Sequence, residues 1–321
     1  MPAHHVDLEK QINFEDMSLT TWNLKTFARE LELPEFVPTR CFGSGMMQTS
    51  LTWLKRVSDS SWDQYERRHL TLPISDGTGD CLTAELIKPD DPEAEARPLI
   101  VLLHGLGGTS QSVYMRSAAL YLCKQGYRVV CLNFRGVGNA SEKCDHIHHP
   151  GRYSDLTALF NEVGSSESYE QELSAGVILV GFSLGGSVLL NYLAREDLDS
   201  RIIGAVSVSA PLDLMATSKC LKLPTRWMFQ YYLLQKMKQE LLCPASRVTD
   251  KEKVCIRNAS SVWEFDKTFT APHSGYDTVE EYYRDNSAGP VLDRIEIPTL
   301  LLFSLDDPIV DGSEYTNRNW H

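Results

Sequence analysis

Five stretches of consecutive apolar residues recur along the chain from residue 98 onward. They are PLIVLLHG (98–105), RVVCLNF (128–134), GVILVGF (176–182), RIIGAVSVSA (201–210) and IPTLLLFS (297–304). Unbroken apolar runs of this length are typical of parallel strands that are buried on both faces of a sheet. Helical patterns at 111–124, 153–163 and 184–195 separate the first four runs. The alternation predicts an α/β fold with a mostly parallel central sheet and helices on both of its faces.

The chain before these runs divides into two parts. Residues 65–72 and 81–88 are expected to form two antiparallel strands, because the turn residues Asp76-Gly77-Thr78-Gly79 lie between them. Residues 1–64 are mixed in character and are interrupted by Pro34 and Pro38. We therefore expect an N-terminal extension that wraps on the fold rather than a separate domain.

The interval between the fourth and fifth runs breaks the alternation of strand and helix. It holds an aromatic-rich helical pattern at 225–242 and polar loops with Pro244, Pro272 and Gly275. The sequence therefore predicts a helical cap inserted at 211–290 into a core of residues 65–210 and 291–321. The cap is either an ordinary packed subdomain or also the roof of a substrate pocket. Its apolar positions fit core and pocket wall better than a membrane surface.

Charge and cysteine usage exclude several classes of protein. The net charge is −12, which would repel the phosphate backbone of a nucleic acid. The eight cysteines show neither zinc-ligand spacing nor a disulfide framework, so we expect reduced thiols, several of them in a core. No secretory signal opens the chain, and polar residues interrupt the most apolar stretch, 176–194. These features predict an intracellular, cytoplasmic protein without a transmembrane segment.

The most specific motif is Gly181-Phe182-Ser183-Leu184-Gly185, which directly follows a predicted strand and precedes a predicted helix. A nucleophilic serine on such a turn adopts strained backbone angles, and the residues two before and two after it must lack bulk. The turn also directs the backbone N–H of Leu184 toward an oxyanion beside the serine. The motif predicts Ser183 as the nucleophile. The alternative is a glycine-rich turn that only packs a helix on the sheet.

A second loop, His104-Gly105-Leu106-Gly107-Gly108, follows the 98–105 run. In this architecture the second oxyanion donor comes from the loop beside the serine turn, and Leu106 is our candidate. His104 is a candidate general base, although a histidine that opens an H-G loop more often orders the loop by hydrogen bonding.

The third element is the sequence SLDDPIV at 304–310, immediately after the last apolar run. A triad acid sits at a strand end, and alignment on D-P-hydrophobic favours Asp307 over Asp306. Both residues could also be ordinary solvated carboxylates. The order of serine before acid requires a histidine after the acid. The one histidine there, His321, lies in an unsuitable context and is a poor candidate.

These motifs together resemble the YheT-like branch of the α/β-hydrolase superfamily, which includes plant embryogenesis-associated proteins and animal lipid hydrolases. The resemblance runs from about residue 36 to residue 310. It rests on GMMQT (45–49), DG (76–77), HGL (104–106), NFRG (133–136), GFSLGG (181–186), FDKTFTAP (265–272), GY (275–276), EYY (281–283) and DDP (306–308).

The resemblance implies a serine hydrolase of carboxylic esters with lipid or acyl-ester substrates. It assigns Ser183 as the nucleophile and Asp307 as the charge-relay acid. Two positions depart from the family pattern: Met46 replaces a usual histidine, and no segment like the family's histidine loop, final strand and final helix follows the acid. On this comparison the chain is expected to be C-terminally truncated, and the identity of the triad histidine stays open.

Weaker signals add little to this picture. The cluster Asp145-His146-Ile147-His148-His149 lacks partners at a familiar metal-ligand spacing, so we expect a loop near the site mouth. The glycines at 105–108 and 136–138 do not have the spacing of a nucleotide-binding loop. No cofactor or metal is required by the predicted chemistry.

Two functional hypotheses follow from the sequence. The first is an esterase that acts on a small-molecule ester or lipid through an acyl-enzyme on Ser183. The second is a truncated or degenerate hydrolase without turnover that binds an acyl ligand or a protein partner. Membrane association stays open, because relatives carry N-terminal anchors and none is recognised here. The oligomeric state is not indicated.

Overall fold

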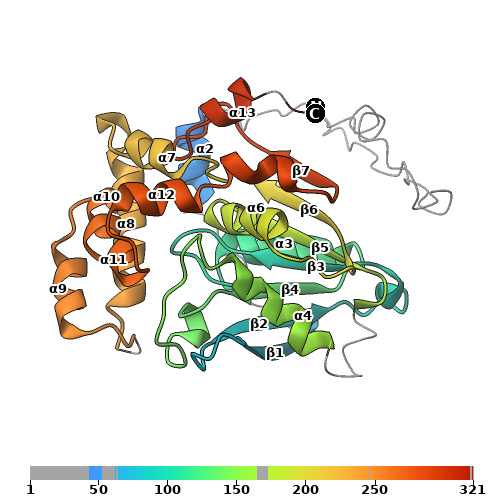
Figure 1. The fold of residues 1–321 in the computed structure, drawn as a ribbon. Coiled ribbons are helices and arrows are strands. Elements are labelled where there is room, and N and C mark those ends of the chain that lie inside the picture. The colour runs from blue at the N-terminus through green and yellow to red at the C-terminus, as the bar shows by residue number, and fades with distance from the viewer. Residues whose placement is uncertain are drawn as a thin grey trace. The chain divides into compact units, whose positions relative to one another are not determined.

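In the described part of the chain, a seven-stranded sheet forms the centre of the fold (Figure 1), in the order β1-β2-β4-β3-β5-β6-β7. The computed structural model describes residues 43–52, 62, 64–164, 173–244, 246–318 and 320. The strands are β1 (Glu66–Pro73), β2 (Cys81–Lys88), β3 (Leu99–Leu103), β4 (Val129–Asn133), β5 (Val177–Phe182), β6 (Ile202–Val208) and β7 (Thr299–Leu302). Of the predicted N-terminal extension, residues 1–42, 53–61 and 63 lie outside the described residues.

The strand directions confirm the predicted mostly parallel sheet. β1 pairs with β2 and β2 with β4 in antiparallel fashion, whereas the pairs from β4 through β3, β5 and β6 to β7 are all parallel. Leu103 at the end of β3 pairs with Gly181 of β5, and Phe182 pairs with Val208 of β6. The loops that follow β3, β5 and β6 therefore leave the sheet at neighbouring positions, where ligands bind in open α/β sheets.

The strands differ in how completely they are buried. Every residue of β3 and β4 is buried, as the unbroken apolar runs predict. The same expectation fails in part for β5, in which buried and half-buried residues alternate, and for β6, whose Ile203 is exposed. It is wrong for β7, whose four residues are all only half-buried. Within the described sheet β7 pairs with β6 alone, so one of its edges has no neighbouring strand to cover it.

The predicted helices cover both faces of the sheet. On one face α4 (Thr157–Gly164) and α6 (Leu184–Arg195) pack through Leu159 and Tyr192 against alternate residues of β3. On the other face α3 (Val113–Lys124) packs through Met115 and Ala119 against the remaining β3 residues. In Figure 1, α4 and α6 lie in front of the sheet and α3 behind it. Leu99, Val101 and Leu103 thus face one layer, whereas Ile100 and Leu102 face the other.

Every described element between β6 and β7 is a helix or a helical turn, as expected from the broken alternation. The helices are α7 (Leu214–Leu221), α8 (Trp227–Leu241), α9 (Asp250–Asn258), α10 (Val262–Phe265), α11 (Ala271–His273) and α12 (Val279–Asn286). A π-helical turn, η7 (Asp266–Thr270), joins α10 to α11. The side chains of Asp213, Thr249, Ser261 and Thr278 cap helix N-termini by accepting a hydrogen bond from the first turn. Buried residues of these helices form their own core around Phe229, Phe265 and Phe269.

The remaining short elements complete the described chain. They are α2 (Gly45–Thr52), α13 (Ser313–Asn317) and the 3₁₀ turns η3 (Ala94–Ala96), η4 (Gly138–Ala140), η5 (Tyr153–Leu156), η6 (Pro224–Arg226) and η8 (Gly289–Arg294). The seven described cysteines are all free thiols, four of them buried, as predicted. In the part of the chain that the structure describes, every helix is too short or too polar to span a bilayer.

Candidate active site

Ser183, the predicted nucleophile, occupies the turn between β5 and α6 in a strained backbone conformation. Its φ is 51° and its ψ is −121°, a combination that residues with a Cβ rarely adopt. The backbone N–H of Ser183 donates a hydrogen bond to the carbonyl oxygen of Val208, at 2.8 Å, which fixes the turn to the end of β6. Strain of this kind persists only where the surrounding structure holds it, and it is concentrated at functional sites.

The glycines around Ser183 are required by close backbone contacts. A Cβ on Gly181 would lie 2.6 Å from the carbonyl oxygen of Gly185, and a Cβ on Gly185 would overlap the carbonyl oxygen of His104. A Cβ on Gly186 would lie 2.7 Å from the Ser207 hydroxyl. The turn can therefore pack against β5, β6 and the loop after β3 only because these positions carry no side chain.

Two backbone N–H groups near Ser183 have no acceptor in the described part of the chain. They belong to Leu106, in the loop after β3, and to Leu184, the first residue of α6. Both residues line the same cavity as Ser183. The N–H of Leu184 also lies at the positive end of the α6 dipole. Such groups are the donors that an oxyanion beside the serine needs.

His104 and Tyr114 order the loop that carries Leu106. The ring of His104 is buried, with Nδ1 2.9 Å from the carbonyl oxygen of Gly105 and Nε2 accepting the N–H of Phe134 at 3.3 Å. Burial lowers the pKa of His104 to about 4, so the ring is neutral at pH 7. The N–H of Gly105 donates to the hydroxyl of Tyr114 at 2.8 Å. With both nitrogens engaged, His104 is a structural residue and not a free base.

The two candidate acids differ in their surroundings. Asp307 is half-buried, and its Oδ1 accepts hydrogen bonds from the N–H groups of Ile309 and Val310 at 2.8 and 2.9 Å. Those two residues line the cavity that holds Ser183. Asp306 is exposed, and its carboxylate accepts bonds from the Ser304 hydroxyl and the N–H of Gly45 in α2. These bonds hold the pKa of Asp306 below its usual value. The geometry favours Asp307 as the residue nearer the cavity.

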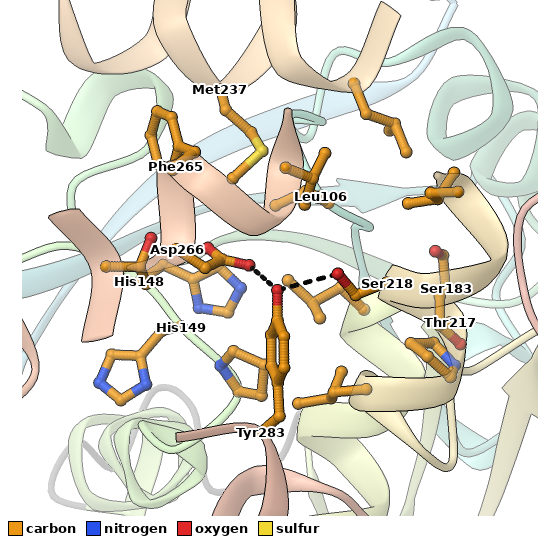
Figure 2. A pocket seen from close by; sticks show the side chains of 18 of the residues that line it. Leu106, His148, His149, Ser183, Thr217, Ser218, Met237, Phe265, Asp266 and Tyr283 are labelled. Carbon is orange, nitrogen blue, oxygen red and sulfur yellow. Dashed lines mark hydrogen bonds between the residues drawn. The ribbon is translucent and has the colours of Figure 1, made fainter. Parts of the chain in front are cut away.

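A largely apolar cavity opens beside Ser183 (Figure 2). Its walls come from the loop after β4, from α7, α8, α10, η7 and α12, and from the turn after β7. The apolar lining residues are Leu106, Ile147, Leu184, Leu214, Leu221, Leu233, Met237, Leu241, Val262, Phe265, Ile309 and Val310. A cavity with this lining suits a hydrocarbon-rich ligand.

A polar cluster that the sequence analysis did not assign lies in the same cavity. The hydroxyl of Tyr283 donates to Oδ2 of Asp266 at 2.6 Å and lies 3.3 Å from the hydroxyl of Ser218 (Figure 2). Burial raises the pKa of Asp266 to about 6, and it raises that of Glu240, another lining residue, to about 7. Asp266 and Tyr283 belong to segments on which the family resemblance rests. The sequence did not show that their side chains are in contact.

The histidine-rich stretch forms part of the cavity wall, near the site as expected. Ile147, His148 and His149 line the cavity, and the ring of His148 stacks on Phe134 with centroids 4.0 Å apart. Burial holds the pKa of His148 well below its usual value and lowers that of His149 to about 3, so both rings are neutral. Among the described residues, no cluster of His, Cys, Asp and Glu could hold a metal ion. His321, the poor candidate for the base, lies outside the described residues.

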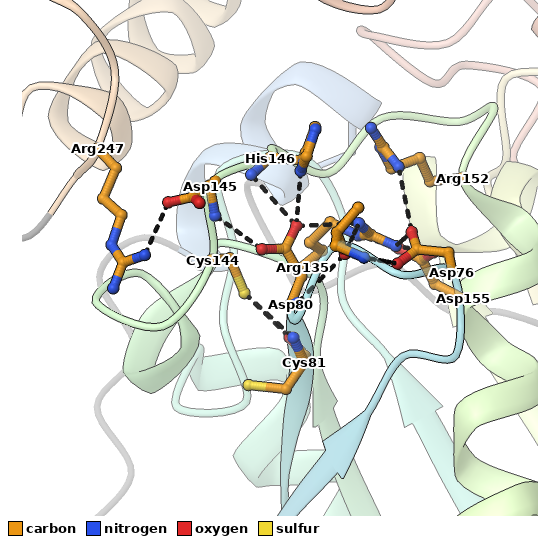
Figure 3. Close-up of polar contacts among 11 residues, drawn as sticks. Asp76, Asp80, Cys81, Arg135, Cys144, Asp145, His146, Arg152, Asp155 and Arg247 are labelled. Atoms are coloured by element: carbon orange, nitrogen blue, oxygen red, sulfur yellow. Dashed lines mark hydrogen bonds and ion pairs between the residues drawn. The ribbon is translucent and has the colours of Figure 1, made fainter.

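A buried ion network holds this wall in place (Figure 3). The fully buried guanidinium of Arg135 pairs with the carboxylates of Asp76, Asp80 and Asp155 at 2.7 to 2.9 Å. Asp80 in turn accepts hydrogen bonds from the N–H groups of Asp145 and His146 and from the His146 ring. The network thus fixes the start of the loop that carries His148 and His149 to the turn between β1 and β2.

A comparison with protein families identifies the architecture. Residues 98–319 match the model of the alpha/beta hydrolase fold. YheT from Escherichia coli, a protein assigned as an esterase, is 30% identical over 297 residues that cover 91% of this chain and 83% of YheT. The chain belongs to the α/β-hydrolase superfamily, in its YheT-like branch. The fold and the family expected from the sequence motifs are therefore confirmed.

Other relatives of this α/β-hydrolase are named for lipid substrates. Human phospholipase ABHD3 is 34% identical over 224 residues, which are 67% of this chain and 52% of the phospholipase. A monoacylglycerol lipase of Saccharomyces cerevisiae is 28% identical over 237 residues, which are 70% of this chain and 51% of the lipase. The chain thus spans about half the length of these relatives.

Solved structures agree on the fold. The esterase Pf2001 of Pyrococcus furiosus superposes with a TM-score of 0.51 at 17% identity, covering 82% of this chain and 80% of the esterase. A puromycin hydrolase superposes with a TM-score of 0.50 at 18% identity, covering 82% of this chain and 34% of the hydrolase. Similarity at this level shows the α/β-hydrolase fold, which many hydrolases share, and does not indicate a substrate.

Proposed function

We propose that this α/β-hydrolase cleaves carboxylic esters of lipids or other acyl compounds through an acyl-enzyme on Ser183. One observation carries the proposal: the strained serine lies beside an apolar cavity into which the free N–H groups of Leu106 and Leu184 also open. The relatives named esterase, phospholipase and monoacylglycerol lipase support the same chemistry.

The proposed reaction has two steps. The Ser183 oxygen attacks the ester carbonyl carbon, and the Leu106 and Leu184 N–H groups hold the negative oxygen of the tetrahedral intermediate. A histidine takes the serine proton and gives it to the departing alcohol, while Asp307 orients the ring. Water then attacks the acyl-enzyme by the reverse proton path, releases the carboxylic acid and restores the serine.

The helices between β6 and β7 are assigned as the cap in this proposal. Residues 211–290 form the cap, residues 65–210 and 291–321 form the hydrolase core, and residues 1–64 form an extension. The cap helices α7, α8 and α10 supply seven of the twelve apolar lining residues named above. An acyl chain in that cavity would bury its CH₂ groups at about 0.8 kcal/mol each.

A second function is favoured by one specific observation. In the part of the chain that the structure describes, the Ser183 hydroxyl makes no hydrogen bond, so no imidazole is in position to take its proton. A chain without such a base would bind an acyl ligand without turnover. The two functions differ in whether the serine reacts.

Labelling with a fluorophosphonate probe tests the esterase proposal. We expect the wild-type protein to be labelled and Ser183→Ala to remain unlabelled. Ser218→Ala, which changes another cavity serine, serves as the matched control and should be labelled like wild type. Circular dichroism establishes that each variant is folded.

Two outcomes would contradict the esterase. One is a folded wild-type chain that the probe does not label, and the other is equal labelling of wild type and Ser183→Ala. An unlabelled chain that binds a fluorescent fatty acid, and loses that binding when Met237 is replaced by Trp, would establish the non-catalytic function instead.

A further inference from the structure

An exposed apolar patch covers the start of α8 and the turn before it. Leu223, Trp227, Met228 and Tyr231 have exposed fractions of 50%, 63%, 38% and 61%. We call these four residues the α8 patch. Single exposed apolar side chains are ordinary, but four large ones within nine residues mark an interaction surface.

The residues of the α8 patch are not among those that line the cavity. Leu233, Met237 and Leu241 of α8 line the cavity. Phe229, also on α8, is fully buried in the core of the helical segment. The inward face confirms the predicted pocket wall, whereas Trp227 and Tyr231, one turn apart, project outward. Internal packing therefore accounts for one face of α8 and leaves the patch uncovered within the described chain.

Basic residues flank the α8 patch along the chain. Lys219, Lys222 and Lys267 are exposed, and Lys222 Nζ lies 3.9 Å above the ring of Trp263. Lys219 and Lys222 precede Leu223 along the chain, Arg226 directly precedes Trp227, and residues 214–239 contain no acidic residue. A local positive cluster stands out on a chain whose net charge is −12.

We propose that the α8 patch docks this protein on an anionic phospholipid bilayer. Aromatic side chains with a polar edge, such as Trp227 and Tyr231, favour the interfacial layer of a membrane. The lysines would meet the negative headgroups beside it. Docking places the outer side of a cavity-forming helix on the lipid, which would bring lipid esters close to the proposed esterase site. The docking itself does not depend on ester hydrolysis.

Charge argues for a bilayer over a second copy of the chain. A two-fold contact between copies places the same surface on both sides of the axis. Lys219, Lys222 and Arg226, which belong to the same stretch as the patch, would then face their own copies and repel them. An anionic bilayer complements the lysines and the aromatic residues at the same time.

Vesicle flotation with the full chain tests this proposal. The vesicles contain phosphatidylcholine alone or with about one-third phosphatidylserine, enough to give the surface a negative potential. We expect the wild type to float with the anionic vesicles and to be released at high salt. The double variant Trp227→Ala/Tyr231→Ala should bind at least about tenfold more weakly. Lys219→Gln and Lys222→Gln should each weaken binding about fivefold.

Matched controls come from α3, away from the patch. Tyr121 is 59% exposed and Lys124 is also exposed, so Tyr121→Ala and Lys124→Gln should bind vesicles like wild type. The proposal fails if wild type does not bind anionic vesicles, or if the double variant binds as well as Tyr121→Ala. It also fails if wild type is a dimer that the double substitution disperses without vesicle binding.

A soluble short-chain ester separates this proposal from the esterase. The double variant should hydrolyse that ester at the wild-type rate, because Trp227 and Tyr231 do not line the cavity. Vesicle binding without any hydrolysis would overturn the esterase and leave the docking surface intact. Hydrolysis of the ester without vesicle binding would support the esterase and overturn the docking surface.

Discussion

A methyl group on Gly105 would lie 3.0 Å from the Cβ of Ser183. The backbone of the loop after β3 thus touches the serine turn directly. This contact follows from the sheet, in which Leu103 and Gly181 are paired neighbours. It sets the position of the Leu106 N–H relative to the Ser183 hydroxyl.

The substitution Gly105→Ala tests whether this contact matters for catalysis. The added methyl must push the loop away by a few tenths of an ångström, which would misplace the Leu106 N–H. Loss of one oxyanion donor lowers kcat by about 10²-fold or more. Steady-state kinetics on a soluble ester would measure this, with KM changing much less.

Gly204→Ala in β6 provides the control for Gly105→Ala. Its new methyl would meet only the carbonyl oxygen of Pro298, at an ordinary 3.5 Å. We expect kcat within about twofold of wild type, since surface changes without a mechanism have small effects. An unchanged kcat for Gly105→Ala would show that Leu106 is not an oxyanion donor.

The assignment of the acid is tested by comparing Asp307→Asn with Asp306→Asn. If Asp307 orients the base, its amide variant selects the wrong tautomer and kcat falls by about 10⁴-fold. Asp306→Asn removes only surface bonds to Ser304 and Gly45, so kcat should stay close to wild type. A larger loss for Asp306→Asn would reverse the assignment.

Asp266 predicts a pH dependence of stability. Its pKa is about 6 in the folded protein because burial disfavours the charged form, against 3.8 when solvated. The folded state therefore holds the proton more tightly, and ionisation between pH 4 and 6 favours unfolding. Between pH 4 and pH 8, the free energy of unfolding of the wild type should therefore fall by about 2–3 kcal/mol more than that of Asp266→Asn.

Urea unfolding of both proteins from pH 4 to 8 measures this difference. Burial lowers the pKa of His149 to about 3, which changes stability with pH in the opposite direction. His149 is present in both proteins, so its contribution cancels when one free energy of unfolding is subtracted from the other. Asp277→Asn at an exposed site is the control and should follow the wild-type profile. A constant offset between wild type and Asp266→Asn at every pH would contradict the prediction.

Met237→Trp should shorten the acyl chain that the proposed esterase accepts. Met237 lines the cavity from α8, and the larger indole would fill space that a long chain needs. We expect kcat/KM to fall at least about tenfold for long p-nitrophenyl esters and little for the acetate, since each lost methylene contact weakens binding. Gln239→Trp, on the exposed side of α8, is the matched control. An equal loss of kcat/KM for all chain lengths would contradict the proposal that the cavity binds the acyl chain.

Arg135→Lys should destabilise the whole fold. A lysine cannot pair with Asp76, Asp80 and Asp155 together, so buried carboxylates lose their partner. Breaking a buried ion network of this kind costs about 3–5 kcal/mol. Arg247→Lys, at the exposed pair with Asp145, should unfold at the wild-type urea concentration. Equal midpoints for the two variants would mean that the network contributes no stability.

The amino-acid sequence by itself determined the sheet and the serine turn. Unbroken apolar runs specify buried strands, and the glycines of the G-x-S-x-G motif are the residues that a tight strand-to-helix turn permits. These signals are local, because periodicity and backbone sterics act over a few residues. They also placed the SLDDPIV loop at the end of the last strand.

Only the tertiary structure decided which distant residues meet in the cavity. Asp266 and Tyr283 lie 17 residues apart, and Ser218 lies 65 residues from Tyr283, yet their hydroxyl and carboxylate groups are in contact. The same packing turns Met237 inward and leaves Trp227 exposed. Both are large apolar residues on one helix, and the sequence gives them the same character. Which face of a helix is covered depends on the neighbours that packing supplies, and those come from distant parts of the chain.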